Sequence, residues 1–194
     1  MLVAFESPLG LAASPVVAGA SGALPPFDFR RVFDAEFRYV WSTLRRLGVS
    51  PRDAEDITHD VFLKVYDKRD AYDPSRPIRP WLFGFAFRAA SDYRRLARHR
   101  VELMDETAPE RAGTSRTDAA LAQKEEAALV DEALSQIDLE KRAVLVAYEM
   151  DESPMKEIAE SMGVPLHTAY SRLKLARAEF AANVRRLRML RGES

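Results

Sequence analysis

The stretch Ser153 to Ala178, SPMKEIAESMGVPLHTAYSRLKLARA, predicts two helices joined by a tight turn. Ser153 followed by Pro154 is typical of a helix start, because serine caps free amides and proline has no amide hydrogen to donate in the first turn. Gly163 stands where a short helix ends in a left-handed residue, and Pro165 restarts the chain. This order of signals predicts a helix-turn-helix.

The second of these helices has one apolar and one polar face. A step of three and four residues, the period of a buried helical face, joins Leu166, Ala169, Leu173, Ala176 and Phe180. The opposite face holds His167, Thr168, Tyr170, Ser171, Arg172, Lys174 and Arg177. A polar, basic second helix suits the major groove of DNA, so we expect this face to bind DNA. The alternative is an ordinary helical hairpin with a solvated face.

The net charge of -1 hides an uneven distribution along the chain. Residues 27–100 hold 16 basic and 11 acidic residues, residues 123–164 hold 4 and 11, and residues 165–194 hold 7 and 2. Two basic blocks separated by acidic chain predict two contacts with nucleic acid. There is no Cys, and the three His residues are far apart in the sequence, so we expect no disulfide, metal or cofactor.

Residues 1–26 are rich in Ala, Gly, Ser and Pro, which predicts a disordered N-terminal tail. A secretory signal peptide is the alternative. Such a signal begins with basic residues followed by an apolar stretch. Here the first basic residue is Arg30, and Glu6, Pro8 and Pro15 interrupt the apolar stretch near the N-terminus. No other stretch is long and apolar enough to span a bilayer. We therefore expect a cytoplasmic protein with no membrane insertion.

A first helical domain is predicted over residues 27–100. Its opening helix has a wide apolar stripe and reaches Leu47, with Gly48 ending it. The stripe is built from Phe29, Val32, Phe33, Phe37, Val40, Trp41 and Leu44. Ser50 and Pro51 then give a second helix start, with acidic residues in its first turns, where they favour the positive end of the helix dipole.

The next helix, PRDAEDITHDVFLKVYDK, separates into two arcs when each residue is turned by about 100°. One arc is expected to be buried and holds Ala54, Ile57, Thr58, Val61, Phe62, Val65 and Tyr66. The other is charged, with Asp56, His59 and Asp60 around an exposed Leu63. An apolar centre with a charged rim is typical of a binding patch. A solvated acidic face with one stray leucine is the alternative.

A loop at residues 73–77 precedes a helix predicted over residues 80–99, PWLFGFAFRAASDYRRLARH. Its buried face is expected to hold Leu82, Phe85, Ala86, Ala89, Tyr93 and Leu96. Phe83 and Phe87 lie on another side, together with Arg94, Arg98 and, further round, Arg95. Exposed aromatic rings beside arginines suit a single nucleic-acid strand, because bases stack on rings while cations follow phosphates. Burial of both rings in the core is the alternative.

Residues 101–117 contain Pro109, Gly113 and several acids without an apolar period, which predicts a flexible acidic linker. A second domain over residues 118–194 is predicted to contain helices at 118–136 and 139–150, followed by the helix-turn-helix. Beyond Phe180, the sequence predicts a phosphate clamp made of Arg185, Arg186, Arg188 and Arg191. The fold class is therefore all-α, with two small helical domains joined by a flexible linker.

With both domains placed, the chain resembles the extracytoplasmic-function group of bacterial RNA polymerase sigma factors over residues 27–187. Three blocks carry the resemblance, in the family's order: DAEDITHDVFLKVY, PWLFGFAFRAASDYRR and IDLEKRAVLVAYEMDESPMKEIAESMGVPLHTAYSRLKLAR. The resemblance implies a promoter-specificity subunit with no active site, since polymerase performs the chemistry. No segment resembles the middle domain of the larger housekeeping sigma factors.

The resemblance also implies partners and site residues. The first domain would bind the clamp helices of the polymerase β′ subunit through Asp56, His59, Asp60 and Leu63, and would open the minus-ten promoter element. The residues expected at that element are Phe83, Phe87, Arg88, Arg94, Arg95 and Arg98. The second domain would bind the minus-thirty-five element through the polar face of the second helix of the helix-turn-helix, which we call the recognition helix. It would also contact the β flap of polymerase. An anti-sigma factor is a further implied partner.

Three residues depart from the family pattern. The family often has Gln at His59, which leaves hydrogen bonding in place but adds charge at low pH. It commonly has Asn at Arg88, beside the pocket for the flipped promoter base, so this departure bears on minus-ten specificity. Many members have Arg at Tyr170, where a phosphate or base contact would be lost or replaced by an apolar one.

Two other functions are compatible with the residues. A stand-alone helix-turn-helix regulator would bind duplex DNA tightly without polymerase. A metal-dependent hydrolase would use Asp56, His59 and Asp60 as ligands, although the sequence offers no ligands from a second helix.

Overall fold

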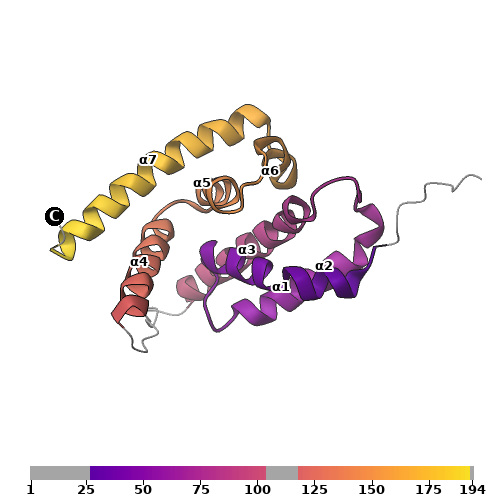
Figure 1. Ribbon diagram of the computed structural model, residues 1–194, viewed down its shortest axis with the longest axis horizontal. Coiled ribbons are helices and arrows are strands. Elements are labelled where there is room, and N and C mark those ends of the chain that lie inside the picture. Colours follow the sequence, from indigo (N-terminus) through magenta and orange to yellow (C-terminus); the bar gives the residue numbers. More distant parts are fainter. Residues whose placement is uncertain (1–26, 104–117, 193–194) are drawn as a thin grey trace, which may run out of the picture.

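The computed structural model describes residues 27–103 and 118–192, with side chains described over residues 27–97 and 125–192. Every regular element in these residues is helical (Figure 1). In chain order they are α1 (Phe29–Arg46), α2 (Ala54–Asp67), the 3₁₀ turn η1 (Arg69–Ala71), α3 (Ile78–Leu103), α4 (Asp118–Ser135), α5 (Leu139–Leu145), the π-helical turn η2 (Val146–Met150), α6 (Met155–Met162) and α7 (Leu166–Leu190). The all-α prediction is confirmed. The predicted tail at residues 1–26 lies outside the described residues.

Helices α1, α2 and α3 pack against one another as a first unit around an apolar core. Aromatic rings fill the space between α1 and α2. Phe62 is 1% exposed, and its ring centroid lies 4.9 Å from that of Phe33, edge to face. Below this aromatic layer, α1 buries Val40 and Leu44 completely. The wide apolar stripe predicted for α1 is thus the surface on which α2 and α3 pack.

The turn between α1 and α2 follows the predicted signals, with one shift. Gly48 has φ +98 and ends α1 in the left-handed region, where a side chain is strained. The Ser50 Oγ accepts a hydrogen bond from the Asp53 amide at 3.2 Å, as a capping serine does. The regular helix nevertheless begins at Ala54, because Pro51 to Asp53 form a turn first.

Helices α4 to α7 form the second unit, in which α6 and α7 are the predicted helix-turn-helix. Gly163 has φ +68 and ends α6, and the Val164 amide closes the turn by donating to the Ala159 carbonyl at 2.9 Å. Ala169, Leu173 and Ala176 are buried as predicted. The expected burial of Leu166 is wrong: this side chain is 45% exposed, at the first turn of α7.

The start of α6 is also displaced from the prediction. The N-cap of α6 is Pro154, not Ser153, the regular helix begins at Met155, and no side chain caps it. Ser153 is buried, and its amide donates to the Ala147 carbonyl at 3.0 Å. It therefore closes the preceding turn, which the sequence signal of serine plus proline did not distinguish from a cap.

The helix predicted over residues 139–150 is regular only as far as Leu145. Its N-cap is Asp138, whose carboxylate accepts a hydrogen bond from the Glu140 amide at 3.0 Å. From Val146 the backbone widens into the π-helical turn η2, and the Asp151 amide donates back to the Val146 carbonyl at 3.2 Å. This widened turn places Asp151 against the first unit.

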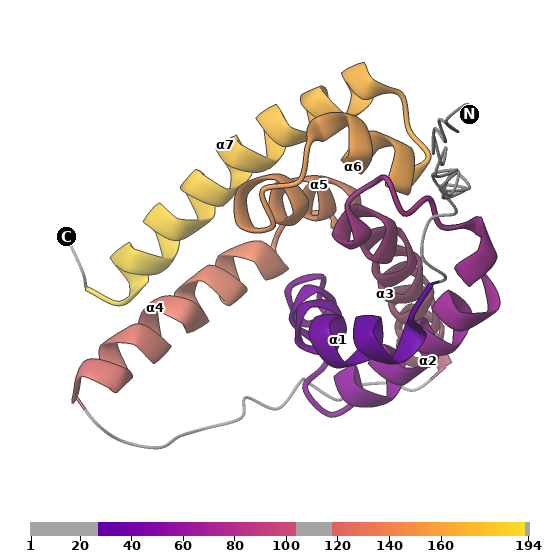
Figure 2. The ribbon, with the colours of Figure 1, turned by 45° about the vertical axis from the view of Figure 1, so that its right-hand side comes forward.

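The two units pack on each other, an arrangement that the prediction of two tethered domains did not contain. Buried residues from both units belong to one continuous apolar cluster. Helix α6 lies on α3, and α4 approaches α1 (Figure 2). Helix α7 lies beyond α5, away from the first unit, in both ribbon views.

The linker predicted over residues 101–117 is only partly described. Residues 101–103 continue α3, and residues 104–117 lie outside the described part of the chain. Among the helices that the structure describes, none has the length and apolar character that crossing a bilayer requires.

Candidate functional site

Helix α2 presents the predicted charged face to solvent. Asp56, His59 and Asp60 are exposed, and Leu63 among them is 64% exposed. The opposite face of the helix is fixed in the core by Val61, Phe62 and Val65. The predicted separation of the two arcs is confirmed except at Tyr66. Binding by the exposed arc stays a prediction.

His59 lies beside the aromatic layer of α1. Its ring centroid is 5.2 Å from that of Phe37 and 5.9 Å from that of Phe33. The imidazole therefore covers the edge of the core while it contributes to the exposed face. Within the described residues, no group of three or more His, Asp or Glu side chains is arranged to hold a metal ion.

The prediction was wrong about Tyr66, which it placed in the buried arc. Tyr66 is 47% exposed, and its ring packs edge-on against Phe29 with centroids 5.1 Å apart. The Arg69 guanidinium covers the ring at 4.3 Å from its centroid. Tyr66 follows Leu63 by one helical turn, so the apolar part of this face is longer than the sequence suggested.

Helix α3 does not present two exposed rings, and this corrects the expectation for Phe83. Phe83 is 1% exposed, and Phe87 is half-buried with its ring stacked on that of Phe83 at 6.5 Å. The reason is that α3 is covered on two sides, by α1 and α2 on one and by α6 on the other. Phe83 thus belongs to the core and cannot stack on a base in this arrangement.

The arginines predicted on α3 do not form one strip. Arg88 donates to the Ser161 carbonyl oxygen of α6 at 3.4 Å, and its guanidinium lies 5.1 Å from the centroid of the Phe85 ring. Partial burial lowers the pKa of Arg88. Arg95 is exposed and pairs with Asp92 at 3.2 Å, whereas Arg94 is half-buried. The side chain of Arg98 lies outside the described residues.

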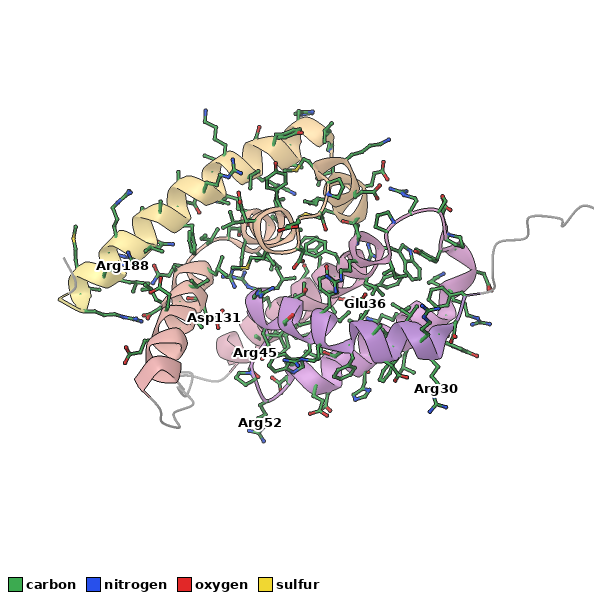
Figure 3. All side chains as sticks on the ribbon, in the orientation of Figure 1. Arg30, Glu36, Arg45, Arg52, Asp131 and Arg188 are labelled. Carbon is green, nitrogen blue, oxygen red and sulfur yellow. The ribbon has the colours of Figure 1, made fainter. Side chains whose placement is uncertain are left out.

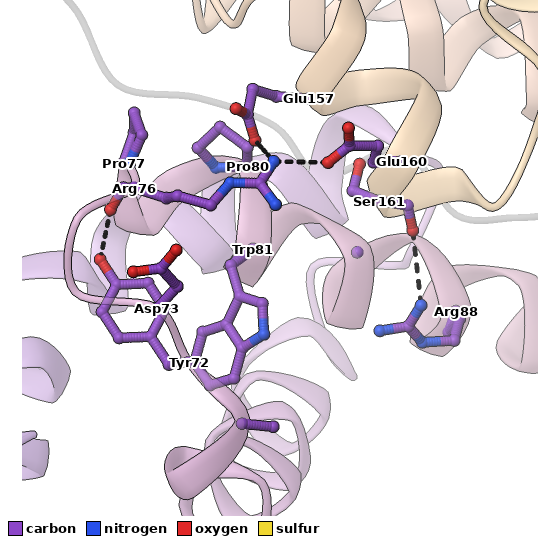
Figure 4. Close-up of a pocket in the computed structure, with 12 residues that line it drawn as sticks. Tyr72, Asp73, Arg76, Pro77, Pro80, Trp81, Arg88, Glu157, Glu160 and Ser161 are labelled. Carbon is purple, nitrogen blue, oxygen red and sulfur yellow. Dashed lines mark hydrogen bonds and ion pairs between the residues drawn. The ribbon is translucent and has the colours of Figure 1, made fainter.

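A pocket of about 260 Å³ opens between the loop before α3 and helix α6 (Figure 4). Its walls combine aromatic and charged side chains: Tyr72, Trp81, Arg76, Arg88, Glu157 and Glu160. The Arg76 guanidinium forms ion pairs with both glutamates of α6. The sequence predicts a loop at residues 73–77, but nothing in it indicates a site there.

The loop that carries Arg76 is held by its own hydrogen bonds. The Asp73 carboxylate accepts from the Ser75 amide at 2.9 Å and from its hydroxyl at 2.7 Å, and these bonds lower the pKa of Asp73. The Tyr72 hydroxyl donates to the Arg76 carbonyl oxygen at 2.6 Å. The sequence DPSRP is the signal from which an ordered turn could have been predicted.

The polar face of α7 is assembled as predicted. Its exposed residues are His167, Tyr170, Ser171, Lys174 and Arg177, and Thr168 and Arg172 are half-buried. Both arginines are already paired within the second unit: Arg172 with Glu140, and Arg177 with Glu149 through Nε at 2.6 Å. A DNA phosphate or base would have to replace these carboxylates.

The arginines at the end of α7 pack against α4. Arg188 lies near the end of α7 (Figure 3) and pairs with Glu126 at 3.0 Å. Arg191 pairs with Glu132 at 3.1 Å, and Arg186 contacts Gln136. These contacts join the ends of the two helices. Of the four arginines predicted as a phosphate clamp, Arg185 alone is exposed without a described hydrogen bond or ion pair, and phosphate binding by the four stays a prediction.

Comparison with known families assigns both units. The family described as Sigma-70 region 2 matches residues 32–100, and Sigma-70 region 4 matches residues 127–180. The ECF RNA polymerase sigma factor SigL of Mycobacterium tuberculosis is 30% identical over 164 residues, which cover 82% of this chain and 90% of SigL. The chain belongs to the ECF group of the sigma-70 family. Region 2 of this sigma factor is therefore α1 to α3, and region 4 lies within α4 to α7.

Other relatives of this sigma factor agree with the assignment. The RNA polymerase sigma factor CnrH of Cupriavidus metallidurans is 28% identical over 149 residues, 71% of this chain and 76% of CnrH. Solved structures support the fold. CnrH in complex with the cytosolic domain of CnrY matches with a TM-score of 0.57 at 22% identity, over 86% of this chain and 89% of CnrH. RpoE of Bartonella quintana, in complex with the anti-sigma factor NepR, matches with a TM-score of 0.60 at 17% identity, over 81% and 97%.

Proposed function

We propose that this sigma factor binds core RNA polymerase through α2 and directs initiation at promoters whose two elements are contacted by regions 2 and 4. The observation that supports the proposal most strongly is the match of both regions to the family, together with an exposed leucine ringed by carboxylates on α2. The chain would act in the cytoplasm, where polymerase transcribes. It would perform no chemistry of its own.

The α2 surface has the properties of a protein-binding hot spot. Leu63 offers an apolar side chain that a partner can desolvate, and Asp56 and Asp60 offer negative charge at its rim. Rim charges mainly guide association and orientation, so the partner surface should carry basic residues around an apolar recess. We propose the clamp helices of the β′ subunit as that surface.

The α7 surface suits duplex DNA. Its first turns are exposed and lie away from region 2 in both ribbon views, so the recognition helix is accessible while the regions are packed together. Ser171, Lys174 and Arg177 supply donors for bases and phosphates in the major groove. We propose that this surface reads the minus-thirty-five element, with the β flap holding region 4 on polymerase.

The minus-ten element is assigned to the exposed part of α3 and its preceding loop. Removing Phe83 from the predicted set leaves Phe87, Arg88, Arg94, Arg95 and Arg98 as candidates on α3. Trp81 and Arg76 of the pocket join them, since they combine an aromatic ring with a cation. The solved relatives CnrH and RpoE are bound to CnrY and NepR, and we propose an anti-sigma partner here also.

The test uses purified core polymerase, this chain and a library of promoter sequences. We expect transcripts that depend on the chain. Asp60→Ala combined with Leu63→Ala should weaken binding to core by about 2 kcal/mol or more if the two are hot-spot contacts. The matched control, Glu125→Ala with Met189→Ala, removes one exposed carboxylate from α4 and one exposed apolar side chain from the end of α7. Both lie outside the residues that match region 4, and the control should leave binding to core unchanged.

A gel shift without polymerase distinguishes the sigma factor from a stand-alone regulator. Two tethered DNA contacts reach high affinity only when polymerase holds both on one promoter, so the isolated chain should bind duplex DNA weakly. Tight, sequence-specific binding by the isolated chain would contradict the proposal.

A further inference from the structure

Large apolar side chains are exposed on α7, within the part of the helix proposed to contact the minus-thirty-five element. Leu166 is 45% exposed, Tyr170 is 53% exposed and Leu175 is 54% exposed. Leu175 belongs to neither of the two faces that the sequence predicted for this helix. Part of the surface that α7 offers to DNA is therefore apolar.

Tyr170 and Leu175 flank the polar centre of this surface. At about 100° per residue, Lys174 and Ser171 lie between them on an arc of about 140°. Leu166 lies one turn before Tyr170 and prolongs that apolar edge toward the start of the helix. Tyr170 and Leu175 are separated by about 7.5 Å along the helix axis, at about 1.5 Å per residue. This distance corresponds to about two base-pair steps, because successive bases of one strand are about 3.4 Å apart.

Both arginines of this surface are held by carboxylates of region 4. Arg172 pairs with Glu140, and only 21% of the arginine side chain is exposed. Arg177 pairs with Glu149 at 2.6 Å through Nε and at 2.5 Å through Nη2. Arginine recognises guanine through two hydrogen bonds, to O6 and N7 of the base. A guanine would have to displace a carboxylate before either arginine could form that pair.

Other side chains that distinguish bases by hydrogen bonds are absent from residues 166–178, LHTAYSRLKLARA. Asn and Gln recognise adenine through two hydrogen bonds, and Asp and Glu accept from cytosine, but this stretch contains none of the four. Lys174 is exposed without a described ion pair, so it is available to one guanine or one phosphate. Ser171 offers a hydroxyl group, which bonds to different bases with little preference. Hydrogen bonds from this surface therefore distinguish few base pairs.

We propose that this sigma factor recognises the minus-thirty-five element chiefly through thymine methyl groups, which Tyr170 and Leu175 contact in the major groove. The inference rests on the proposed function, because it names the base chemistry that α7 selects. The C5 methyl group of thymine is the apolar feature of the major-groove base edges, and apolar side chains bind it. Each contact removes apolar surface of both partners from water. The element should hold two thymines, on either strand, about two base pairs apart.

Uracil in place of thymine tests a single methyl group, because uracil keeps every hydrogen-bonding group of thymine. The full chain with core polymerase first selects promoters from a library that is random in the minus-thirty-five element. Binding to a selected promoter is then measured with one thymine at a time replaced by uracil. We expect two thymines at which uracil weakens binding about three- to fivefold, as the burial of one methyl group predicts. Uracil at thymines outside both promoter elements is the control and should change nothing.

Substitutions on α7 assign each methyl contact to a side chain. At the thymine that Leu175 contacts, uracil should weaken binding of the wild type but not of Leu175→Ala, which has no side chain left to lose the contact. Tyr170→Ala should behave in the same way at the other thymine, whereas Tyr170→Phe keeps the ring and should behave like the wild type. Leu190→Ala is the matched control, because Leu190 is 78% exposed at the end of α7. It should leave both effects of uracil intact.

The outcomes separate this inference from the function on which it rests. If the wild-type chain with core polymerase binds no promoter of the library, the proposed function is contradicted and this inference with it. Promoter complexes without selected thymines, or with equal binding of thymine and uracil promoters, would overturn methyl recognition alone. Leu175→Ala and Tyr170→Ala could also weaken binding of thymine and uracil promoters by the same factor. The two side chains would then contact something other than the methyl groups, which would overturn the inference as well.

Discussion

The Tyr39 hydroxyl donates a hydrogen bond to the Asp151 carboxylate at 3.1 Å, which joins α1 of region 2 to the end of η2 in region 4. The two residues are 112 positions apart in the sequence. Burial, more than the nearby carboxylate, raises the pKa of Tyr39, so the hydroxyl keeps its proton and acts as a donor at all physiological pH values. This hydrogen bond is therefore a direct contact between the two regions.

Tyr39→Phe should destabilise the chain by about 0.5–1.5 kcal/mol, because the hydroxyl bond is lost and an acceptor oxygen of Asp151 is left without that donor. The free energy of unfolding in urea measures the change. Tyr148→Phe is the matched control: Tyr148 is 36% exposed, its ring lies under Arg177, and the loss of its hydroxyl should change stability by less than about 0.5 kcal/mol. Equal effects of the two substitutions would show that the Tyr39 bond contributes nothing.

The Asp151 carboxyl gives the stability a pH dependence. Its pKa is raised because burial disfavours the charged form, against the opposing effects of the Tyr39 hydrogen bond, Arg46 and Arg79. The folded chain therefore holds this proton more tightly than the unfolded chain does. The resulting contribution to stability is complete below the ordinary Asp value of about 3.9 and is lost as pH rises through the higher folded value.

Comparison of wild type with Asp151→Asn isolates this contribution from those of other carboxyls. The free energy of unfolding of the wild type, minus that of the variant, should fall as pH rises from about 4 and should become constant above the folded pKa. Urea denaturation at a series of pH values measures it. A difference that grows with pH would show that the attraction of Arg46 and Arg79 outweighs the burial of the carboxylate.

The periodicity of the sequence predicted which side of a helix is buried when one neighbour covers it. It placed Ala169, Leu173 and Ala176 in the core and Leu63 on the surface, as the structure confirms. It misjudged Phe83, because α3 is covered on two sides and a single stripe cannot indicate that. The apolar periodicity of a helix indicates which of its faces is buried, but it does not indicate how many other elements pack on that helix.

The contacts between regions were not predictable in the same way. Arg76 and Glu160 are 84 positions apart, and each reads as an ordinary surface charge in its own segment. The sequence has no Pro or Gly in the π-helical turn that begins at Val146, so nothing there predicts the widening of the backbone. What could be predicted was the opposite net charge of residues 27–100 and 123–164, two segments that the structure brings together.

Phe62 and Leu63 are adjacent, and their substitutions should separate folding from binding. Phe62 is 1% exposed between α1 and α2, so Phe62→Ala should cost about 3–5 kcal/mol of stability. Leu63→Ala should change stability by less than about 0.5 kcal/mol, because 64% of the side chain is already in water, but should weaken binding to core polymerase. Urea denaturation and core-binding titrations measure the two effects. A stable Leu63→Ala protein that binds core like wild type would contradict the assigned face.

Gly48 and Gly163 both have a positive φ, so alanine at either position is strained by about 1–2 kcal/mol. The two sites differ in their surroundings. A Cβ at Gly48 would lie 2.8 Å from Nη1 of Arg142, whereas a Cβ at Gly163 would meet no atom within 4 Å. Because Nη2 of Arg142 is held by the Ser135 and Ile137 carbonyls, the guanidinium cannot move away without breaking these bonds.

Gly48→Ala should therefore destabilise the chain more than Gly163→Ala in urea denaturation. Equal losses of stability would show that Arg142 does not pack tightly against the turn after α1.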